Sequence, residues 1–173
     1  MSPRIHARKS TVVVVGLLAL SCMNCGGGTP GPTDPVRGGA CTSMGCEDGL
    51  HVALSPDSGW PAGAYRFVIV ADGQTTVCEG ALPLRACEQG ASLKCDRPGV
   101  MIGESGCALP AAQHGFASIQ LAAGPANVVV TIERDGKELV RKSMAPAYRE
   151  THPNGPSCPP ACRQASDAIG VAF

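Results

Sequence analysis

The chain has 173 residues with 14 basic and 14 acidic side chains, and only 3% of its residues are aromatic. Residues 1–21 contribute three of the basic side chains and no acid, so the rest holds 11 basic against 14 acidic residues, a net charge near −3. Nucleic-acid binding requires a basic surface. This balance therefore excludes nucleic acid as a partner.

The N-terminus has the pattern of a secretory signal peptide. Arg4, Arg8 and Lys9 are followed by an apolar run over residues 12–20, and the small residue Ser21 ends it. A basic start, a short apolar stretch and a small residue are typical of export signals. Because a membrane-spanning helix needs roughly 18 or more apolar residues, we predict that residues 1–21 are a signal peptide and not an anchor.

The stretch "LALSC" resembles the bacterial lipobox, in which a small residue precedes a cysteine that is lipidated and becomes the new N-terminus. The resemblance implies that Cys22 carries the lipid. Cys25 is the weaker candidate, because "CMN" precedes it. Met23, not Asp, follows the cysteine, and the resemblance then implies sorting to the outer membrane. The expected location is outside the cytoplasm, lipid-anchored to the cell envelope, with the membrane as a partner.

Residues 22–40 have the composition of a tether. They include six glycines and three prolines, and beyond Met23 and Val36 they contain no large hydrophobic side chain. Such a segment does not bury enough apolar surface to fold. As a flexible coil its ends would average roughly 20–25 Å apart. We predict a lipid-anchored Gly/Pro-rich tether that separates residues 41–173 from the membrane surface.

The first strand pattern of the folded part is "GLHVALS". Leu50, Val52 and Leu54 alternate there with His51 and Ala53. A period of two places alternate side chains on opposite faces of a sheet. The three larger apolar residues are therefore expected to face the core.

Two further patterns predict hairpins from their turns. A β-branched run over residues 65–71 meets Asp72-Gly73, and a run over residues 128–133 meets Asp135-Gly136. Asp-Gly accepts the positive φ angles of a two-residue type I′ turn. We interpret these as equivalent hairpins, one in each half of a sandwich.

Shorter strands are predicted at residues 91–95, 99–103, 117–122 and 169–173, with one or two helical turns within residues 159–168. About nine short strands separated by Gly and Pro turns are typical of an antiparallel sandwich. The predicted fold class for residues 41–173 is all-β: an immunoglobulin-like, disulfide-stapled antiparallel β-sandwich. Trp60 and Tyr65 are expected to cap its core, with an exposed binding patch as the alternative.

Eight cysteines follow the tether, and an even number in an exported chain predicts a disulfide framework. Zinc sites favour two-residue spacing or mixtures of His and Cys, whereas "CTSMGC" and "CPPAC" have four and three intervening residues. We therefore expect no metal and no cofactor. The predicted disulfide cysteines are Cys41, Cys46, Cys78, Cys87, Cys95, Cys107, Cys158 and Cys162.

The two prolines of "CPPAC" limit the possible pairings. An extended proline-like path places Cys158 and Cys162 roughly 12 Å apart, and a disulfide needs Cα atoms within about 7 Å. Because domain termini often lie close in space, we expect these two to bond to Cys41 and Cys46. The four middle cysteines are expected to pair locally, as Cys78–Cys87 and Cys95–Cys107, with Cys78–Cys95 and Cys87–Cys107 as the alternative.

The lipobox-like start, the tether, "PAGAYRFVIVADG" and the closing "PNGPSCPPACRQA" together resemble the uncharacterised exported bacterial lipoproteins with an immunoglobulin-like or transthyretin-like β domain. The resemblance covers most of the chain after residue 21. It implies the fold and the location. It transfers no active-site residues.

No catalytic constellation stands out. "GESGC" around Ser105 resembles a protease nucleophile loop, but no companion motif supplies a base and a carboxylate. The leading interpretation is a non-enzymatic envelope lipoprotein that binds a protein or glycan partner or has a structural role. The alternative is a small exported hydrolase that uses His114 or His152 with a nearby acid. Two histidines that share a pocket with an Asp or Glu would favour the hydrolase.

Overall fold

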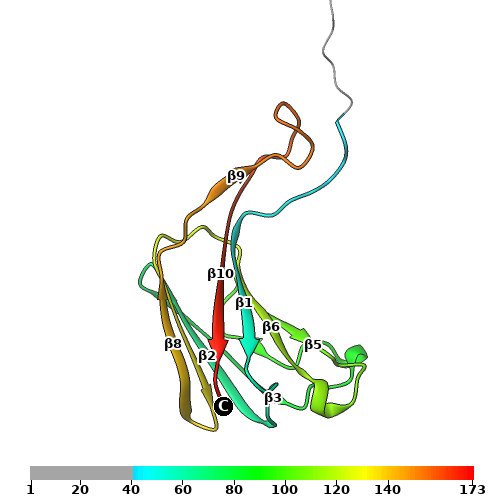
Figure 1. Cartoon of the computed structure of the whole chain (residues 1–173), viewed down its shortest axis with the longest axis vertical. Helices are drawn as coiled ribbons and strands as arrows, with labels where there is room; N and C mark the ends of the chain where they lie inside the picture. Colours follow the sequence, from blue (N-terminus) through cyan, green and yellow to red (C-terminus); the bar gives the residue numbers. More distant parts are fainter. Residues whose placement is uncertain (1–40) are drawn as a thin grey trace, which may run out of the picture. The chain divides into compact units, whose positions relative to one another are not determined.

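Ten strands form two five-stranded sheets across residues 41–173, the part of the chain that this computed structural model describes (Figure 1). The predicted signal peptide, Cys22, Cys25 and the tether lie outside these residues. Within residues 41–173, no helix has the length and apolar character needed to cross a bilayer.

The first sheet, here sheet A, has the strand order β5-β6-β1-β10-β9. Its strands are β1 (Gly49–Pro56), β5 (Val100–Ser105), β6 (Gly115–Leu121), β9 (Arg149–Thr151) and β10 (Cys162–Val171). The second, sheet B, has the order β4-β3-β2-β7-β8. Its strands are β2 (Gly63–Ala71), β3 (Gln74–Leu82), β4 (Lys94–Cys95), β7 (Val128–Arg134) and β8 (Lys137–Met144). Two short 3₁₀ turns, η1 (Cys87–Gln89) and η2 (Ala111–Gln113), lie in the connections.

The predicted all-β sandwich is confirmed, but one strand pair is parallel. β1 and β10 run in the same direction over eight residue pairs, from Gly49 opposite Gln164 to Pro56 opposite Val171. The remaining pairs in both sheets are antiparallel. A disulfide joins Cys46, just before β1, to Cys162 at the start of β10. Because this bridge brings the beginnings of the two strands together, they leave it side by side and parallel.

Both predicted hairpins form, with the predicted turn chemistry. Asp72 and Asp135 have φ angles of 45° and 52°, and the following Gly73 and Gly136 have φ angles of 83° and 77°. These positive values at both turn positions are those that a type I′ turn requires. The Asp-Gly sequences therefore fix the β2–β3 and β7–β8 connections locally.

The prediction that the hairpins lie in different halves of the sandwich is wrong. β2 pairs directly with β7, with Phe67 opposite Ile132, so both hairpins belong to sheet B. On the outer face of that sheet, Arg66 lies 3.1 Å from a carboxylate oxygen of Glu79 and 3.3 Å from one of Glu133. The one arginine thus links three neighbouring strands.

Two local predictions are also wrong. The strand predicted over residues 91–95 is only the two-residue β4, and the helix predicted within residues 159–168 is replaced by β10. In β10, Ala165, Ile169 and Val171 are buried at alternating positions. Packing of sheet A against sheet B buries this face, and tertiary packing of this kind overrides local helix propensity.

Five of the six aromatic side chains of residues 41–173 form one cluster in the core. Phe116 packs edge-to-face against Trp60, Tyr65 and Phe67, with ring centroids 5.0, 5.1 and 5.2 Å apart. Trp60 and Tyr65 are buried, which confirms that they cap the core and excludes them as an exposed patch. Phe173 packs against Trp60 from the rim and is 38% exposed.

The eight cysteines form four disulfides. Cys41 bonds to Cys158 and Cys46 to Cys162, which matches the expected long-range links. The favoured local pairing of the middle four is wrong, and the alternative pairing is the one formed: Cys78–Cys95 and Cys87–Cys107. β3 and β4 place Cys78 directly opposite Cys95, with their Cα atoms 3.9 Å apart.

A charged contact joins one strand of each sheet. Lys142 on β8 donates to Asp167 on β10 at 2.8 Å and to the Ala168 carbonyl at 2.6 Å. The pKa of Asp167 lies below its ordinary value of 3.8. The main cause is the hydrogen bond from Lys142, and the hydrogen bond from the Ala168 backbone N–H is the second. The pKa of Asp167 is lower in the folded chain than in the unfolded chain. The contact therefore stabilises the fold fully at a pH above the unfolded-state pKa, and this stabilisation is lost as the pH falls through the folded-state pKa.

We therefore expect Asp167→Asn to lower the free energy of unfolding at pH 7 by up to about 1 kcal/mol, a small effect because both side chains are partly solvent-screened. In acid, at a pH below the folded-state pKa of Asp167, variant and parent should have nearly equal stability. Urea unfolding at the two pH values measures this. An equal loss at both would show that the charge of Asp167 is not the cause.

Candidate functional site

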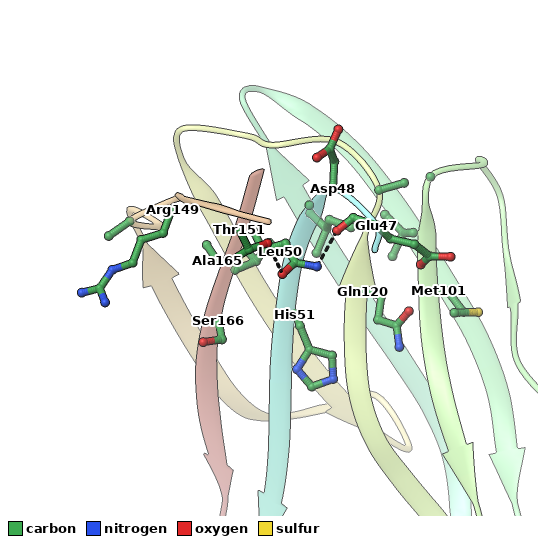
Figure 2. Close-up of a pocket in the computed structure, with 17 residues that line it drawn as sticks. Glu47, Asp48, Leu50, His51, Met101, Gln120, Arg149, Thr151, Ala165 and Ser166 are labelled. Carbon is green, nitrogen blue, oxygen red and sulfur yellow. Dashed lines mark hydrogen bonds between the residues drawn. The ribbon is translucent and has the colours of Figure 1, made fainter. Parts of the chain in front are cut away.

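An open groove of about 1300 Å³ lies at the end of sheet A where β1 begins (Figure 2). It is lined by residues of β5, β6, β1, β10 and β9 and by the segment that precedes β1. A volume of this size exceeds that of a typical small-molecule site. The groove can therefore hold a segment of a larger ligand.

A row of hydrogen-bonding side chains crosses the groove. His51 on β1 is paired in register with Gln120 on β6 and with Ser166 on β10, and Gln120 is paired with Met101 on β5. Figure 2 shows His51, Gln120 and Ser166 projecting from the same side of three neighbouring strands. The row therefore offers an imidazole, an amide, a hydroxyl and an exposed thioether on one surface.

The upper rim carries two carboxylates, on Glu47 and Asp48. Gln164 donates from Nε2 to the Glu47 carbonyl at 2.7 Å and accepts from the Thr151 hydroxyl at 3.2 Å. The backbone N–H of Arg163 donates to Asp48 Oδ1 at 2.6 Å. These bonds fasten the acidic rim to β10, so its position relative to the groove is fixed.

Gly49 shapes the groove because no side chain fits at its position. Its φ is +127°, and a Cβ placed there would lie 2.0 Å from the Leu121 carbonyl oxygen. Gly49 thus allows β1 and the end of β6 to approach closely below the rim.

The groove has an asymmetric charge distribution. In Figure 2 the Glu47 side chain extends toward β5 and lies near Met101, whereas Arg149 projects from β9 on the opposite side, away from the polar row. Across residues 41–173 there is no group of three or more His, Cys, Asp or Glu side chains that could hold a metal ion. The chemistry of the groove is hydrogen bonding together with attraction of a cation at its β5 side.

His114 is a structural residue outside the groove. It is 8% exposed. Its Nδ1 accepts from the Leu84 backbone N–H at 2.9 Å, and its Nε2 lies 2.8 Å from the Leu109 carbonyl oxygen. An Nδ1 that accepts a hydrogen bond requires the neutral tautomer with the proton on Nε2, which donates to Leu109. Both ring nitrogens are therefore engaged, and they join the β3–β4 connection to the β5–β6 connection.

We expect His114→Ala to lower the free energy of unfolding by about 1–3 kcal/mol, because it leaves the buried Leu84 N–H and the Leu109 carbonyl without their partner. The exposed His51 provides the matched control, and His51→Ala should change stability by no more than about 0.5 kcal/mol. Urea unfolding of the oxidised proteins compares the two. Equal effects would contradict the structural role of His114.

The three histidines of residues 41–173 lie in different environments, and only His51 lines the groove. His152 follows β9, and its Nε2 lies 2.9 Å from Glu150 Oε1. Within the described part of the chain no hydroxyl donates a hydrogen bond to this imidazole. His114 and His152 are the histidines expected for a hydrolase. The structure does not place the two of them in one shared pocket with an acid.

Most groove residues carry a weak sequence signal. Gln120 and Met101 occupy positions on predicted strands, whose alternation does not mark them as neighbours, and Ser166 lies in the segment where helical turns are predicted. Glu47 and Asp48 stand in an irregular segment that the bridges at Cys41 and Cys46 hold in place. Only His51 could be singled out beforehand, and its neighbours depended on the strand order.

Comparisons of the chain with protein-family models, with curated proteins and with solved structures find no match. The class that the fold defines is a disulfide-stapled β-sandwich domain with an open polar groove on one sheet.

Proposed function

We propose that this chain is a non-enzymatic lipoprotein of the cell envelope, anchored through Cys22, whose sandwich domain binds a protein or glycan partner. The observation that carries the binding role is the groove of sheet A, where hydrogen-bonding side chains from neighbouring strands converge beneath a fixed acidic rim. The tether would present this groove at a distance from the membrane surface. Sorting to the outer membrane is part of the proposal.

Export is supported by the disulfides. Four bridges join all eight cysteines of residues 41–173. Disulfides persist in oxidising compartments and are rare in the cytosol. A structure that depends on them is suited to the periplasm or the cell surface.

The anchor is tested by metabolic labelling with a palmitate analogue. Cys22→Ala should abolish the label and the partition into membranes, while Cys25→Ala should retain both. A label that disappears only with Cys25→Ala would move the anchor by three residues. A parent protein that is soluble and unlabelled would refute the lipoprotein assignment.

The binding role is tested with a photo-crosslinking amino acid placed at Gln120 in intact envelopes. We expect a discrete adduct, and the same amino acid at Thr75, which is exposed on β3 of sheet B, should give none. Absence of an adduct at both positions would favour a purely structural role. Digestion of the adduct with protease or glycosidase identifies the partner as protein or glycan.

The alternative function is an exported hydrolase, and the observation that favours it is the contact between His152 and Glu150. In the binding proposal, His152→Ala leaves all activity of the folded domain intact. Turnover of activated esters or amides by the parent that disappears in a folded His152→Ala variant would establish the hydrolase instead.

A further inference from the structure

We infer that the groove binds an extended peptide of a partner protein, which pairs with β5 as an additional strand of sheet A and places a Lys or Arg side chain on Glu47. The inference rests on the proposed binding function and narrows its partner to a protein segment. It follows from the exposed edge of sheet A, from the chemistry beside it and from the position of Glu47.

β5 is the least protected edge strand of the sandwich. Of the other edge strands, β4 and β9 have two and three residues, and β8 carries four charged side chains: Lys137, Glu138, Arg141 and Lys142. Short edges and edge charges prevent pairing with other chains. Residues 100–103 of β5 carry no charge. This edge therefore lacks the usual protection.

The backbone of β5 presents hydrogen-bonding groups at this edge. The Ala122 N–H donates to the Gly99 carbonyl at 2.9 Å, so this pair is hydrogen-bonded. Bonded pairs alternate along an antiparallel ladder, which makes Met101 and Gln120 the next one. Val100 and Ile102 consequently direct their N–H and C=O groups away from β6, toward the position of a sixth strand.

The part of the β5 edge that is available for pairing ends at a break in the β5–β6 ladder. A register shift between Gly103 and Glu104 interrupts the β5–β6 ladder. Beyond it, Glu104 Oε1 accepts a hydrogen bond from the Leu93 N–H at 2.6 Å. A strand on the edge would therefore pair beside Val100 and Ile102 and leave the edge at the shift. Strand addition of this kind supplies affinity through the main chain and specificity through alternate side chains.

Glu47 supplies the charge for that specificity. Its side chain extends toward β5 beside Met101 in Figure 2, and Met101 is 55% exposed. A Lys or Arg stem can lie along an apolar side chain while its charged head reaches a carboxylate. Arg149, the cation among the groove residues, projects away on the far side. The β5 side of the groove is thus complementary to a basic side chain.

The test uses a phage-displayed library of random decapeptides, panned against the oxidised full chain. We expect enriched peptides in which β-branched residues alternate and a Lys or Arg recurs at one fixed position. For a synthetic enriched peptide, Glu47→Gln should weaken binding about threefold to fivefold, the scale of an exposed ion pair. Glu88→Gln, on the exposed η1 turn, should leave the dissociation constant unchanged. Failure to enrich any peptide, or equal binding by the parent and Glu47→Gln, would overturn the inference.

Strand pairing is tested separately in the peptide. N-methylation of the alternate amides that face β5 should abolish binding, whereas N-methylation of the other alternate set should be tolerated. Equal tolerance or equal loss for the two sets would refute pairing with β5. If panning fails while the crosslinker at Gln120 still captures a glycan or a folded protein, the peptide inference falls and the proposed binding function stands.

Discussion

Removing both bridges that join the ends of the domain should unfold it or nearly so. The Cys41–Cys158 and Cys46–Cys162 disulfides span 117 and 116 residues. In the loop-entropy model the first closure of such a loop contributes about 5 kcal/mol, and the second, which closes only a small ring of about ten residues, adds about 2.5 kcal/mol. The combined loss of about 7.5 kcal/mol is comparable to the whole stability of an ordinary domain.

The same reasoning predicts that the two bridges are not additive. Replacing only Cys41 and Cys158 by Ala, or only Cys46 and Cys162, should each cost about 2.5 kcal/mol, because the remaining bridge still closes the long loop. The loss in the quadruple variant should exceed the sum of the two separate losses by about 2.5 kcal/mol, as a double-mutant cycle from urea unfolding measures. Additive losses would show that the bridges act independently of the loop that they share.

Phe116→Ala should have the largest effect of any single substitution in the core, about 3–5 kcal/mol. The side chain is 1% exposed and packs edge-to-face against three other rings. Its removal leaves a cavity and also forfeits aromatic contacts worth about 0.5–1.5 kcal/mol each.

Phe173→Ala is the matched control, because this ring contacts Trp60 alone among the aromatic residues of the described chain and is partly exposed. We expect a loss of less than about 1.5 kcal/mol for it, within the ordinary range of point substitutions. Thermal unfolding and the near-ultraviolet circular dichroism of Trp60 compare the variants. A loss at Phe173 as large as at Phe116 would place the centre of the aromatic cluster elsewhere.

Features that depend on neighbouring residues could be predicted from the sequence, and features that depend on strand order could not. Each Asp-Gly turn is determined by two adjacent residues, and both hairpins were predicted. Their position in one sheet depends on the β2–β7 pairing, which no local pattern encodes. In β10 the apolar alternation is interrupted by Asp167, whose partner Lys142 comes from the other sheet. Considered without that long-range contact, the residues of this segment favour a helix.

The candidate site shows the same division more strongly. The outward direction of His51 follows from the alternation in "GLHVALS", and His51 is exposed on β1. Its neighbours Gln120 and Ser166 come from β6 and β10, and the order of those strands is set by long-range pairing. The groove is thus a property of the assembled sheet and not of any motif.

The bridges at the two ends of the domain also have a topological consequence. They make residues 46–158 a loop that is covalently closed at its base, so one backbone cut anywhere within it yields two pieces that remain joined by both disulfides. The exposed connection around Arg97, between β4 and β5, is such a position. After a protease cuts the domain there, the two pieces would separate on a reducing gel but would migrate together on a non-reducing gel. When a protease reaches this connection, the first cut would neither release a fragment nor separate the strands that form the groove.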